Sequence, residues 1–396
     1  MENKLYLKKA KLSGYKSIED VEIDFQKGLN IIIGKNAAGK TNFLSFLNKA
    51  ISFDFQDLSN FTSFLLFENG KEFSIDSSKN VELDDLFNSA NLNSEVETIL
   101  KVSNKIVKDK KSSTIQEKLQ NKKLYFDNSF LCHGIPNEYL VVDKPATFTF
   151  EIDKISNQLS KIFRGVNNPY FLRSFTLDLI FVTFDIKELE ENYIEKKLNN
   201  LFDKYKKMSG VFSTYTPIED LRISDNFNLF IDKEKNNFVL SNLFFEFKVD
   251  GQWLPFSNLS DGTKRLFYII SEIYDDYFVS SIRPTTCGFF TSKEDISRII
   301  LLEEPELGIH PHQFHKLLEF LKVESKTKQL IITTHSPQAL DSIDENELSR
   351  IIMAYSNNSS EGTKLRHLDD KELSKAKEYI KENFLSDYWL YSDLEK

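Results

Sequence analysis

The chain has 396 residues, with 51 lysines and arginines against 60 aspartates and glutamates, which gives a formal net charge of −9. Its length exceeds that of one ordinary domain, and a composition that is 40% hydrophobic and 28% charged is typical of a globular protein with a sizeable core. The negative charge opposes binding of the whole molecule to nucleic acid or anionic membranes, so any such contact would need a local basic patch.

Neither export nor membrane insertion is expected from the sequence. The start of the chain leads into a strand without an apolar signal segment, and the longest apolar run, residues 171–184, is interrupted by Arg173 and Asp178. The only cysteines, Cys132 and Cys287, support neither a disulfide framework nor a cysteine-based zinc site. We therefore expect a cytoplasmic protein in a reducing compartment.

The first part of the chain predicts three strands and a helix. Apolar and polar residues alternate over Leu5–Leu12 and again over Val21–Phe25, and Lys27-Gly28 turns the chain into the apolar run Leu29–Ile33. A helical pattern follows over Thr41–Phe53.

The segment between the third strand and the helix has the spacing G-x-x-x-x-G-K-T of a phosphate-binding loop. Gly34 and Gly39 allow the backbone to turn its N–H groups toward a β-phosphate. Lys40 neutralises β- and γ-phosphate charge, and Thr41 offers its hydroxyl to Mg²⁺ at a helix N-terminus. A glycine-rich turn that matches by chance is the alternative, and the flanking strand and helix weigh against it. We expect ATP or GTP to bind through Gly34, Asn36, Ala37, Ala38, Gly39, Lys40, Thr41 and Asn42.

Beyond the helix, the pattern predicts a hairpin and then a polar helical region. Ser63–Phe67 and Phe73–Ile75 are strand-like and flank the turn sequence Asn69-Gly70. Residues 84–123 are helical and polar, and the end of this stretch is rich in lysine, including Lys108, Lys110 and Lys111. This basic stretch fits a solvated helical face, or a contact with nucleic acid or a partner protein.

A strand at Thr147–Ile152 and an amphipathic helix at Ile186–Met208 complete the middle of the chain. Strands then return at Asn228–Ile231, Phe238–Leu240 and Phe244–Val249. We found no internal repeat and no sustained seven-residue periodicity, which excludes long coiled-coil arms.

The sequence Leu259-Ser260-Asp261-Gly262 precedes the apolar helical run Leu266–Ile273. Ser260 and Gly262 at a helix N-terminus predict a second phosphate-binding nest, directed outward. Without further context, the same residues also fit an ordinary helix-capping turn.

An apolar strand over residues 298–302 ends in two carboxylates, Glu303 and Glu304. A central parallel strand that ends in adjacent acids indicates a site that serves a cation or a proton. We expect Glu303 to hold Mg²⁺ or its water, and Glu304 to act as the general base that polarises the attacking water. The alternative is that both side chains cap the strand and lie in solvent.

A second apolar strand, Gln329–Thr334, ends in His335. This histidine could donate a hydrogen bond to the γ-phosphate or to the attacking water. A lone histidine after a strand is often structural, but its place after the carboxylate pair favours a role in hydrolysis.

These four motifs, in this order, resemble the ABC-type ATPase head. Within it, Gly14–Ile18, Glu304–Pro311 and Thr333–Pro337 resemble the OLD/RecF-like branch of AAA ATPases rather than transporters. The segment Phe384–Leu390 resembles the C-terminal helix of stand-alone ATPases from abortive-infection, retron and PARIS-type anti-phage systems. The resemblance implies an α/β fold, with a mixed central sheet, an antiparallel β-subdomain and an inserted helical lobe.

The expected organisation has three parts. Residues 1–76 form the first half of the ATPase head with the Walker A loop. Residues 77–215 form an inserted, mainly helical lobe. Residues 216–396 form the second half of the head, with the signature, the Walker B strand and the histidine switch.

The resemblance also implies a homodimer, or dimers within a larger homo-oligomer, that sandwiches ATP. Lys40 and Thr41 of one subunit would face Ser260 and Gly262 of the other, and Lys16 would lie near the nucleotide. The sequence departs from the transporter pattern at Asp261 and Glu303, in a long loop over residues 277–297, and in the lack of a convincing Gln loop, which leaves one Mg²⁺ ligand unassigned.

The resemblance and the composition leave three functions open. The first is a Mg²⁺-dependent defence ATPase that regulates a separate effector, such as a nuclease or toxin, because the segment up to Lys396 carries no convincing set of nuclease acids. The second is a RecF-like repair ATPase that binds DNA directly, which the acidic charge disfavours. The third is a nucleotide-gated scaffold with almost no hydrolysis.

Overall fold

The computed structural model describes residues 6–52, 58–68, 70, 72–76, 126–131, 146–151, 175, 179, 189–274, 297–356 and 362–391. The chain forms two compact units. Residues 1–133, 291–306 and 321–396 form the first, and residues 134–290 and 307–320 form the second. The lysine-rich stretch predicted within 84–123 lies outside the described residues, as does nearly all of the long loop predicted before the acidic strand.

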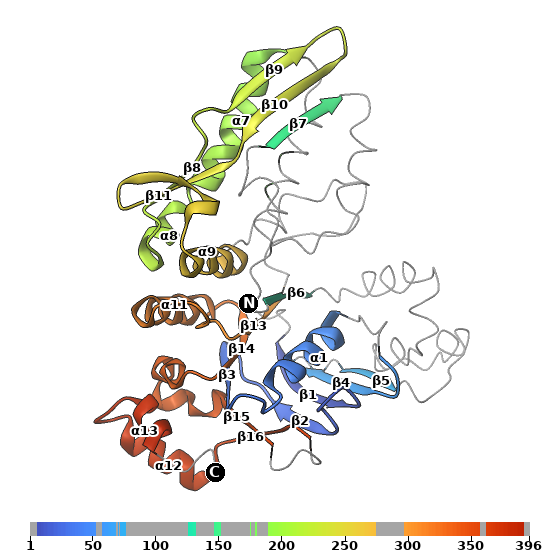
Figure 1. Ribbon diagram of the computed structural model, residues 1–396. Helices are drawn as coiled ribbons and strands as arrows, with labels where there is room; N and C mark the ends of the chain where they lie inside the picture. Colours follow the sequence, from blue (N-terminus) through green and yellow to red (C-terminus); the bar gives the residue numbers. More distant parts are fainter. Residues whose placement is uncertain are drawn as a thin grey trace, which may run out of the picture. The chain divides into compact units, whose positions relative to one another are not determined.

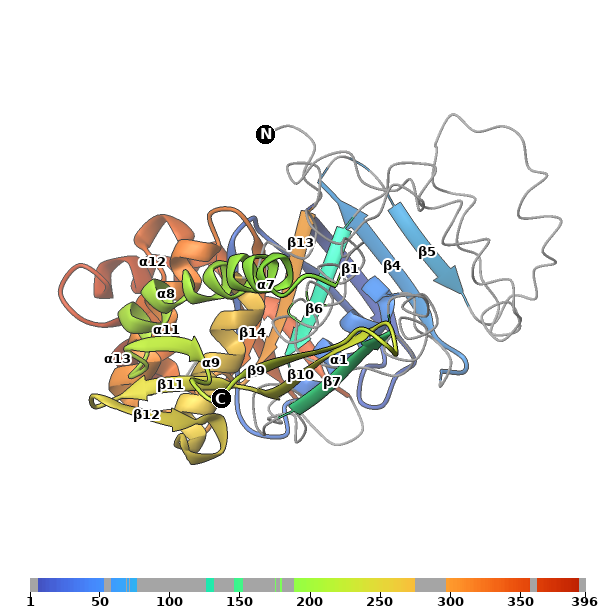
Figure 2. The same cartoon turned by 90° about the horizontal axis from the view of Figure 1, so that it is seen from above.

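A six-stranded mixed sheet forms the centre of the first unit, in the order β16-β15-β3-β14-β13-β6. All neighbouring pairs are parallel except β15 and β16 (Figure 1). The strands are β3 Leu29–Ile33, β6 Phe126–Leu131, β13 Ser297–Glu303, β14 Gln329–Thr334, β15 Ile351–Tyr355 and β16 Lys364–His367. Figure 2 shows β13, β6 and β14 beside one another. The predicted strands at the phosphate loop, the acid pair and the histidine are therefore confirmed.

The register of the three central strands brings their carboxyl ends to one edge. Ile33 pairs with Thr334, and Thr333 pairs with Glu303. Every residue of β3 and β14 is buried, as expected for parallel strands covered on both faces. The segments that follow these strands therefore start next to one another.

Helix α1, Lys40–Ser52, follows the phosphate loop and packs into the core of this unit. Its buried residues Phe43, Phe46 and Leu47 join Ile32 and Ile331 of the six-stranded sheet in one apolar cluster. Leu12 and Leu65 of a second sheet belong to the same cluster, which places α1 between the two sheets (Figure 1).

The second sheet of the unit is antiparallel, in the order β2-β1-β4-β5. Its strands are β1 Leu7–Ser13, β2 Val21–Asp24, β4 Thr62–Phe67 and β5 Glu72–Asp76. The predicted hairpin is confirmed, because β4 pairs with β5 and Gly70 between them has φ +79°. The α/β class with a mixed sheet and an antiparallel β-subdomain is thus confirmed.

Gln329 joins the two sheets. Its side chain accepts a hydrogen bond from the Leu7 N–H at 2.8 Å and donates one to the Leu7 carbonyl, also at 2.8 Å. Because Gln329 is fully buried, these two hydrogen bonds satisfy polar groups whose burial without partners would cost stability. It fixes the first residue of β1 against the first residue of β14.

The carboxyl-terminal part of the first unit adds two strands and two helices, and the last helix lies at the segment Phe384–Leu390 that resembles a C-terminal helix. After β15 and β16 come α12, Asp370–Tyr379, and α13, Leu385–Tyr391. Asp341, in the 3₁₀ helix Pro337–Ser342, accepts hydrogen bonds from the backbone and hydroxyl of Ser386, at 2.8 and 2.9 Å. Helix α13 is therefore attached to the segment that follows His335.

The second unit contains two three-stranded antiparallel sheets, β7-β10-β9 and β12-β11-β8. Phe175, Tyr205 and Phe245 pack in its aromatic core, with ring centroids 4.9 to 6.4 Å apart. Its strands are β7 Ala146–Glu151, β8 Asp220–Ile223, β9 Asn228–Asp232, β10 Asn237–Leu243, β11 Phe245–Val249 and β12 Gln252–Pro255. Its helices are α7 Glu191–Lys206, α8 Ser209–Tyr215, α9 Asp261–Tyr274 and the first part of α11 Pro311–Glu324.

The predicted inserted lobe, residues 77–215, stays a prediction because much of it lies outside the described residues. One described part of it, β6, pairs in parallel with β13 and so belongs to the six-stranded sheet. In the described ranges, no helix combines the length and apolar character needed to cross a membrane.

Candidate nucleotide site

The loop between β3 and α1 is shaped by close backbone approaches at its glycines. A Cβ atom on Gly34 would lie 2.1 Å from the Ala354 carbonyl oxygen, and one on Gly39 would lie 1.7 Å from Thr363 Oγ1. Gly39 also has φ +86°, and Ala37 between them has φ +65°. These left-handed positions turn the backbone into a loop of the kind that presents N–H groups to an anion.

Lys40, the first residue of α1, is directed back into this loop. Its Nζ donates hydrogen bonds to the carbonyl oxygens of Gly34 at 2.7 Å and Lys35 at 3.0 Å, and the residue is only 4% exposed. The ammonium group is therefore held inside the loop, where it could neutralise a bound phosphate. Thr41, the next residue, is exposed at the start of the helix, so its hydroxyl is accessible to a ligand.

Two hydroxyl groups and an amide support the back of the loop. Ser17 Oγ lies 2.8 Å from Thr363 Oγ1 and accepts a hydrogen bond from Asn42 Nδ2, also at 2.8 Å. The Thr363 N–H donates to the Ser17 carbonyl at 2.7 Å. Asn42, predicted to bind nucleotide, thus has a structural partner on the β1–β2 hairpin.

The acid pair at the end of β13 lies two strands from the loop. Glu303 is 2% exposed, whereas the Glu304 side chain is 20% exposed. Glu304 has φ +42°, which is unusual for a residue with a side chain, and its N–H donates to the Thr333 carbonyl at 2.8 Å. Such backbone strain is found at functional sites, where the surrounding structure holds it in place.

His335 follows β14, between the loop and the acid pair. Its Nδ1 lies 3.7 Å from Glu304 Oε1 and 3.4 Å from Glu306 Oε1. Glu306 is a site residue that the sequence pattern alone did not predict. Its place two residues after Glu304, across the intervening proline, was the available signal.

The first unit therefore brings together the predicted loop residues, the acid pair and the histidine at one edge of one sheet. With strands about 4.8 Å apart, β3 and β13 are separated by roughly 10 Å, a distance that a triphosphate and a metal ion can bridge. Buried Thr333 Oγ1, on the strand between them, has no hydrogen-bond partner among the described residues, as is typical next to a bound water or ion. These residues fit a nucleotide with Mg²⁺, and Thr41 and Glu303 would supply the oxygen ligands that Mg²⁺ prefers.

The predicted signature lies in the second unit, at the start of α9. Ser260 Oγ accepts a hydrogen bond from the Thr263 N–H at 3.2 Å and lies 2.8 Å from Thr263 Oγ1, so Ser260 is the N-cap of the helix. Ser260 is also exposed, and a Cβ on Gly262 would lie 2.8 Å from the Gly308 carbonyl oxygen. The capping alternative is therefore realised, and it leaves the helix N-terminus accessible to an anion.

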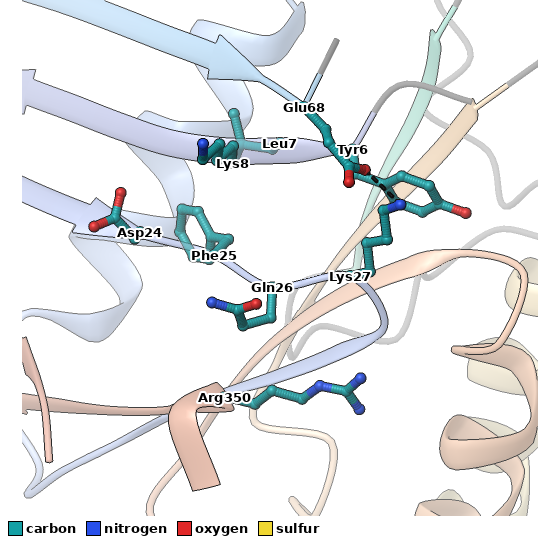
Figure 3. A pocket seen from close by; sticks show the side chains of 9 residues that line it. All are labelled: Tyr6, Leu7, Lys8, Asp24, Phe25, Gln26, Lys27, Glu68 and Arg350. Carbon is teal, nitrogen blue, oxygen red and sulfur yellow. Dashed lines mark ion pairs between the residues drawn. The ribbon is translucent and has the colours of Figure 1, made fainter. Parts of the chain in front are cut away.

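Two cavities lie at opposite ends of β3. One, of about 340 Å³, is lined by loop residues 35–38, by Tyr355 at the end of β15 and by Trp389 of α13. The other, of about 510 Å³, lies before the first residues of β3 and β15 (Figure 3). Two of its three lining cations are paired, Lys27 with Glu68 at 2.7 Å and Arg350 with Glu347.

A protein family and one curated relative match large parts of the chain. The family described as "AAA domain, putative AbiEii toxin, Type IV TA system" matches residues 133–341, just over half of the chain. The Septu protein PtuA of Bacillus thuringiensis is 21% identical over 356 residues, which cover 87% of this chain and 75% of that protein.

Further similarities are local or distant. The DNA replication and repair protein RecF of Streptococcus agalactiae is 48% identical over 40 residues, about 10% of this chain and 11% of RecF. Among solved structures, an Smc head bound to the C-terminal winged-helix domain of ScpA is 15% identical, with 93% and 99% of the two chains covered and a TM-score of 0.47. An Smc head from a complex with the Pyrococcus furiosus ScpA C-terminal domain is 16% identical, with 96% and 100% covered and a TM-score of 0.43.

Proposed function

The chain belongs to this AAA-domain family of ATPases, and on that premise we propose that it is a Mg²⁺-dependent ATPase whose ATP-driven self-association regulates a separate effector protein in an anti-phage defence system. The observation that carries the proposal is the register of β3, β14 and β13. In this register, the glycine-rich loop with Lys40, the histidine and the two carboxylates lie at the carboxyl ends of neighbouring strands, which supports the proposal.

Each side chain has a separate role in the proposed reaction. The loop N–H groups and Lys40 bind the β- and γ-phosphates, and Thr41 and Glu303 hold the metal. Bound Mg²⁺ would neutralise charge that develops on the phosphates. Glu304 accepts a proton from the attacking water, and His335 donates a hydrogen bond at the γ-phosphate or the water.

We further propose that the signature acts across a subunit interface. Ser260 and Gly262 of one subunit would contact the γ-phosphate held by Lys40 and Thr41 of another, so that ATP joins two subunits. The exposed N-terminus of α9, a helix of 14 residues, supports this role because the start of a helix favours an anion. A homodimer or a larger homo-oligomer would follow.

The effector would be a separate nuclease or toxin. The similarity to Septu PtuA over most of the chain supports a place in a defence system. The stand-alone defence ATPases that the Phe384–Leu390 segment resembles support the same assignment. We place the docking surface for the effector on the inserted lobe, residues 77–215, because that lobe contributes none of the phosphate-binding residues.

A RecF-like repair ATPase that binds DNA directly is the second candidate. The 40-residue match to RecF favours it, but so short a match covers only about a tenth of each protein. The net charge of −9 opposes DNA binding outside a local basic patch.

The test combines an assay of the purified protein with affinity capture. We expect the protein to release phosphate from MgATP and to leave DNA and RNA intact until its partner is added. Tagged protein in its native host should capture one predominant partner, and replacing Lys108, Lys110 and Lys111 with Glu should reduce that capture without loss of ATPase activity. Metal-dependent cleavage of nucleic acid by the purified chain, abolished by a point mutation within it, would overturn the proposal. Tight, salt-sensitive DNA binding without a captured partner would favour the RecF-like alternative.

A further inference from the structure

Glu306 contacts His335 more extensively than either of the predicted acids does. Its Oε1 accepts a hydrogen bond from the Thr334 hydroxyl at 2.7 Å and one from the His335 N–H at 3.0 Å. The same oxygen lies 3.4 Å from His335 Nδ1. One carboxylate oxygen therefore faces the backbone and the side chain of the histidine at once.

The surroundings of Glu306 hold this arrangement in place. Its side chain is 10% exposed, and the Thr334 hydroxyl that donates to it accepts a hydrogen bond from the Ser336 N–H at 2.9 Å. Within the described part of the chain, no donor reaches the buried Oε2 of Glu306. The carboxylate is thus directed at the turn that carries His335.

The contacts also indicate which imidazole nitrogen carries a proton. Nδ1 faces carboxylate oxygens of Glu304 and Glu306, and a carboxylate can only accept. A proton on Nδ1 is the arrangement that satisfies both groups, and it leaves Nε2 for a ligand.

We propose that Glu306 is the positioning residue of His335: it holds Nδ1 in the protonated form and fixes the ring next to Glu304. It acts through the histidine and does not itself contact the reacting atoms. The effect of Glu306 on hydrolysis rests on the proposed ATPase function. The tautomer and orientation of His335 can be measured without nucleotide.

The kinetic test uses Glu306→Gln, which keeps an oxygen for the Thr334 hydroxyl and the His335 N–H but removes the charge that faces Nδ1. We expect a loss of about 10- to 100-fold in kcat with little change in KM, the usual cost of removing a group that orients a functional histidine. In a His335→Asn background, the same substitution should cause almost no further loss, because Glu306 acts through His335.

The matched control is Glu319→Gln on α11. Glu319 also pairs with a histidine, since its Oε1 lies 3.6 Å from His315 Nε2, but 58% of its side chain is exposed and no site residue contacts it in the described structure. This variant should retain wild-type kcat. A wild-type kcat in folded Glu306→Gln, or fully additive losses with His335→Asn, would overturn the proposal.

The structural test is nitrogen NMR of ¹⁵N-histidine-labelled protein without nucleotide, at one fixed pH. There are six histidines, and the His335→Asn spectrum identifies the signal to follow. We expect Nδ1 of His335 to be protonated in the wild type and to lose that state in Glu306→Gln. An unprotonated Nδ1 in the wild type, or an unchanged Nδ1 signal in the variant, would contradict the proposal. If the wild type hydrolyses no ATP, the proposed function fails, while this spectrum still decides the role of Glu306.

Discussion

Ser17 Oγ lies 2.8 Å from Thr363 Oγ1, although 346 residues separate the two side chains in the sequence. Both atoms lie next to Gly39, where a Cβ would be 2.9 Å from Ser17 Oγ and 1.7 Å from Thr363 Oγ1. The phosphate loop is therefore contacted by one segment near residue 17 and by another near residue 363. Its shape depends on distant contacts as well as on its own sequence.

We predict that Gly39→Ala prevents ATP binding and destabilises the protein. The methyl group would meet Thr363, and φ +86° costs a residue with a side chain about 1–2 kcal/mol. Gly251→Ala is the matched control, because Gly251 has φ +73° with no atom within 4 Å of the added methyl. In urea unfolding, both variants should lose stability. In calorimetry, Gly39→Ala should lose ATP binding, whereas Gly251→Ala should bind ATP as the wild type does. Normal ATP affinity in Gly39→Ala would show that the loop does not need this conformation.

Lys40→Ala should abolish ATP binding while the protein remains folded. Its ammonium group contacts the Gly34 and Lys35 carbonyls, so its loss costs about 1–2 kcal/mol of stability but removes the charge that the phosphates need. Calorimetric titration with MgATP measures the effect, and Lys49→Ala, in the last turn of α1, is the control. An unchanged ATP affinity in folded Lys40→Ala would refute the assignment of this loop.

Ser260→Arg should allow each subunit to bind ATP through Lys40 but prevent turnover and ATP-dependent association. The bulky cation would occupy the place proposed for the neighbour's γ-phosphate. Loss of the N-cap should cost about 1 kcal/mol of stability, and urea unfolding of Ser260→Ala measures that cost without the added cation.

Mixing Ser260→Arg with Lys40→Ala gives the sharper test of an interface site. Mixed dimers should contain one intact composite site of the two and recover part of the activity. Mixed dimers that are shown to form but hydrolyse no ATP would argue against a site shared between subunits.

Acid should remove one stabilising interaction of the carboxyl-terminal region. Two hydrogen bonds from Arg366, at 2.6 and 2.8 Å, hold the pKa of Glu372 below its ordinary value of 4.5. Because the folded-state pKa is lowered, this contribution is complete above pH 4.5 and is lost as the pH falls through the folded value. Glu372→Gln should therefore cost about 1 kcal/mol at pH 7 and progressively less in acid.

Urea unfolding at several pH values measures this difference, with Glu378→Gln as a control on the exposed face of the same helix. If the stability lost in Glu372→Gln stays constant from pH 7 to the acid limit, the charge of Glu372 does not cause that loss.

The parts of the fold that the sequence predicts are those that local patterns determine. The apolar runs that became β3 and β14 are continuous because both faces of these strands are covered, and the loop after β3 is defined by its own glycines. The acid pair and His335 could be predicted because charged or polar side chains directly after a buried strand indicate a functional site.

The parts that the sequence did not predict depend on long-range pairing. β15 and β16 are short, and the pairing of β15 with β3 is set by contacts with residues far away in the chain. Thr363 gave no signal at all, since its role follows from Ser17 and Gly39. Glu306 gave a weak signal, a third acid next to the pair, but only the position of His335 shows which group it serves.

Substitutions of Glu303 and Glu304 should fail in different ways. Glu304→Gln keeps the shape of the side chain but removes the proposed base, so ATP should bind and persist. Loss of a general base lowers the rate by about 10²–10⁴-fold. Glu303→Ala should instead weaken Mg²⁺-dependent ATP binding, because it removes the proposed metal ligand.

The most direct test of the ATPase assignment is the amount of ATP hydrolysed by Glu304→Gln relative to wild type, under conditions in which calorimetry shows both to be saturated with MgATP. We predict a rate about 10²–10⁴-fold below wild type with ATP affinity retained. A Glu304→Gln protein that hydrolyses ATP at the wild-type rate would contradict the account, because the base would then lie elsewhere.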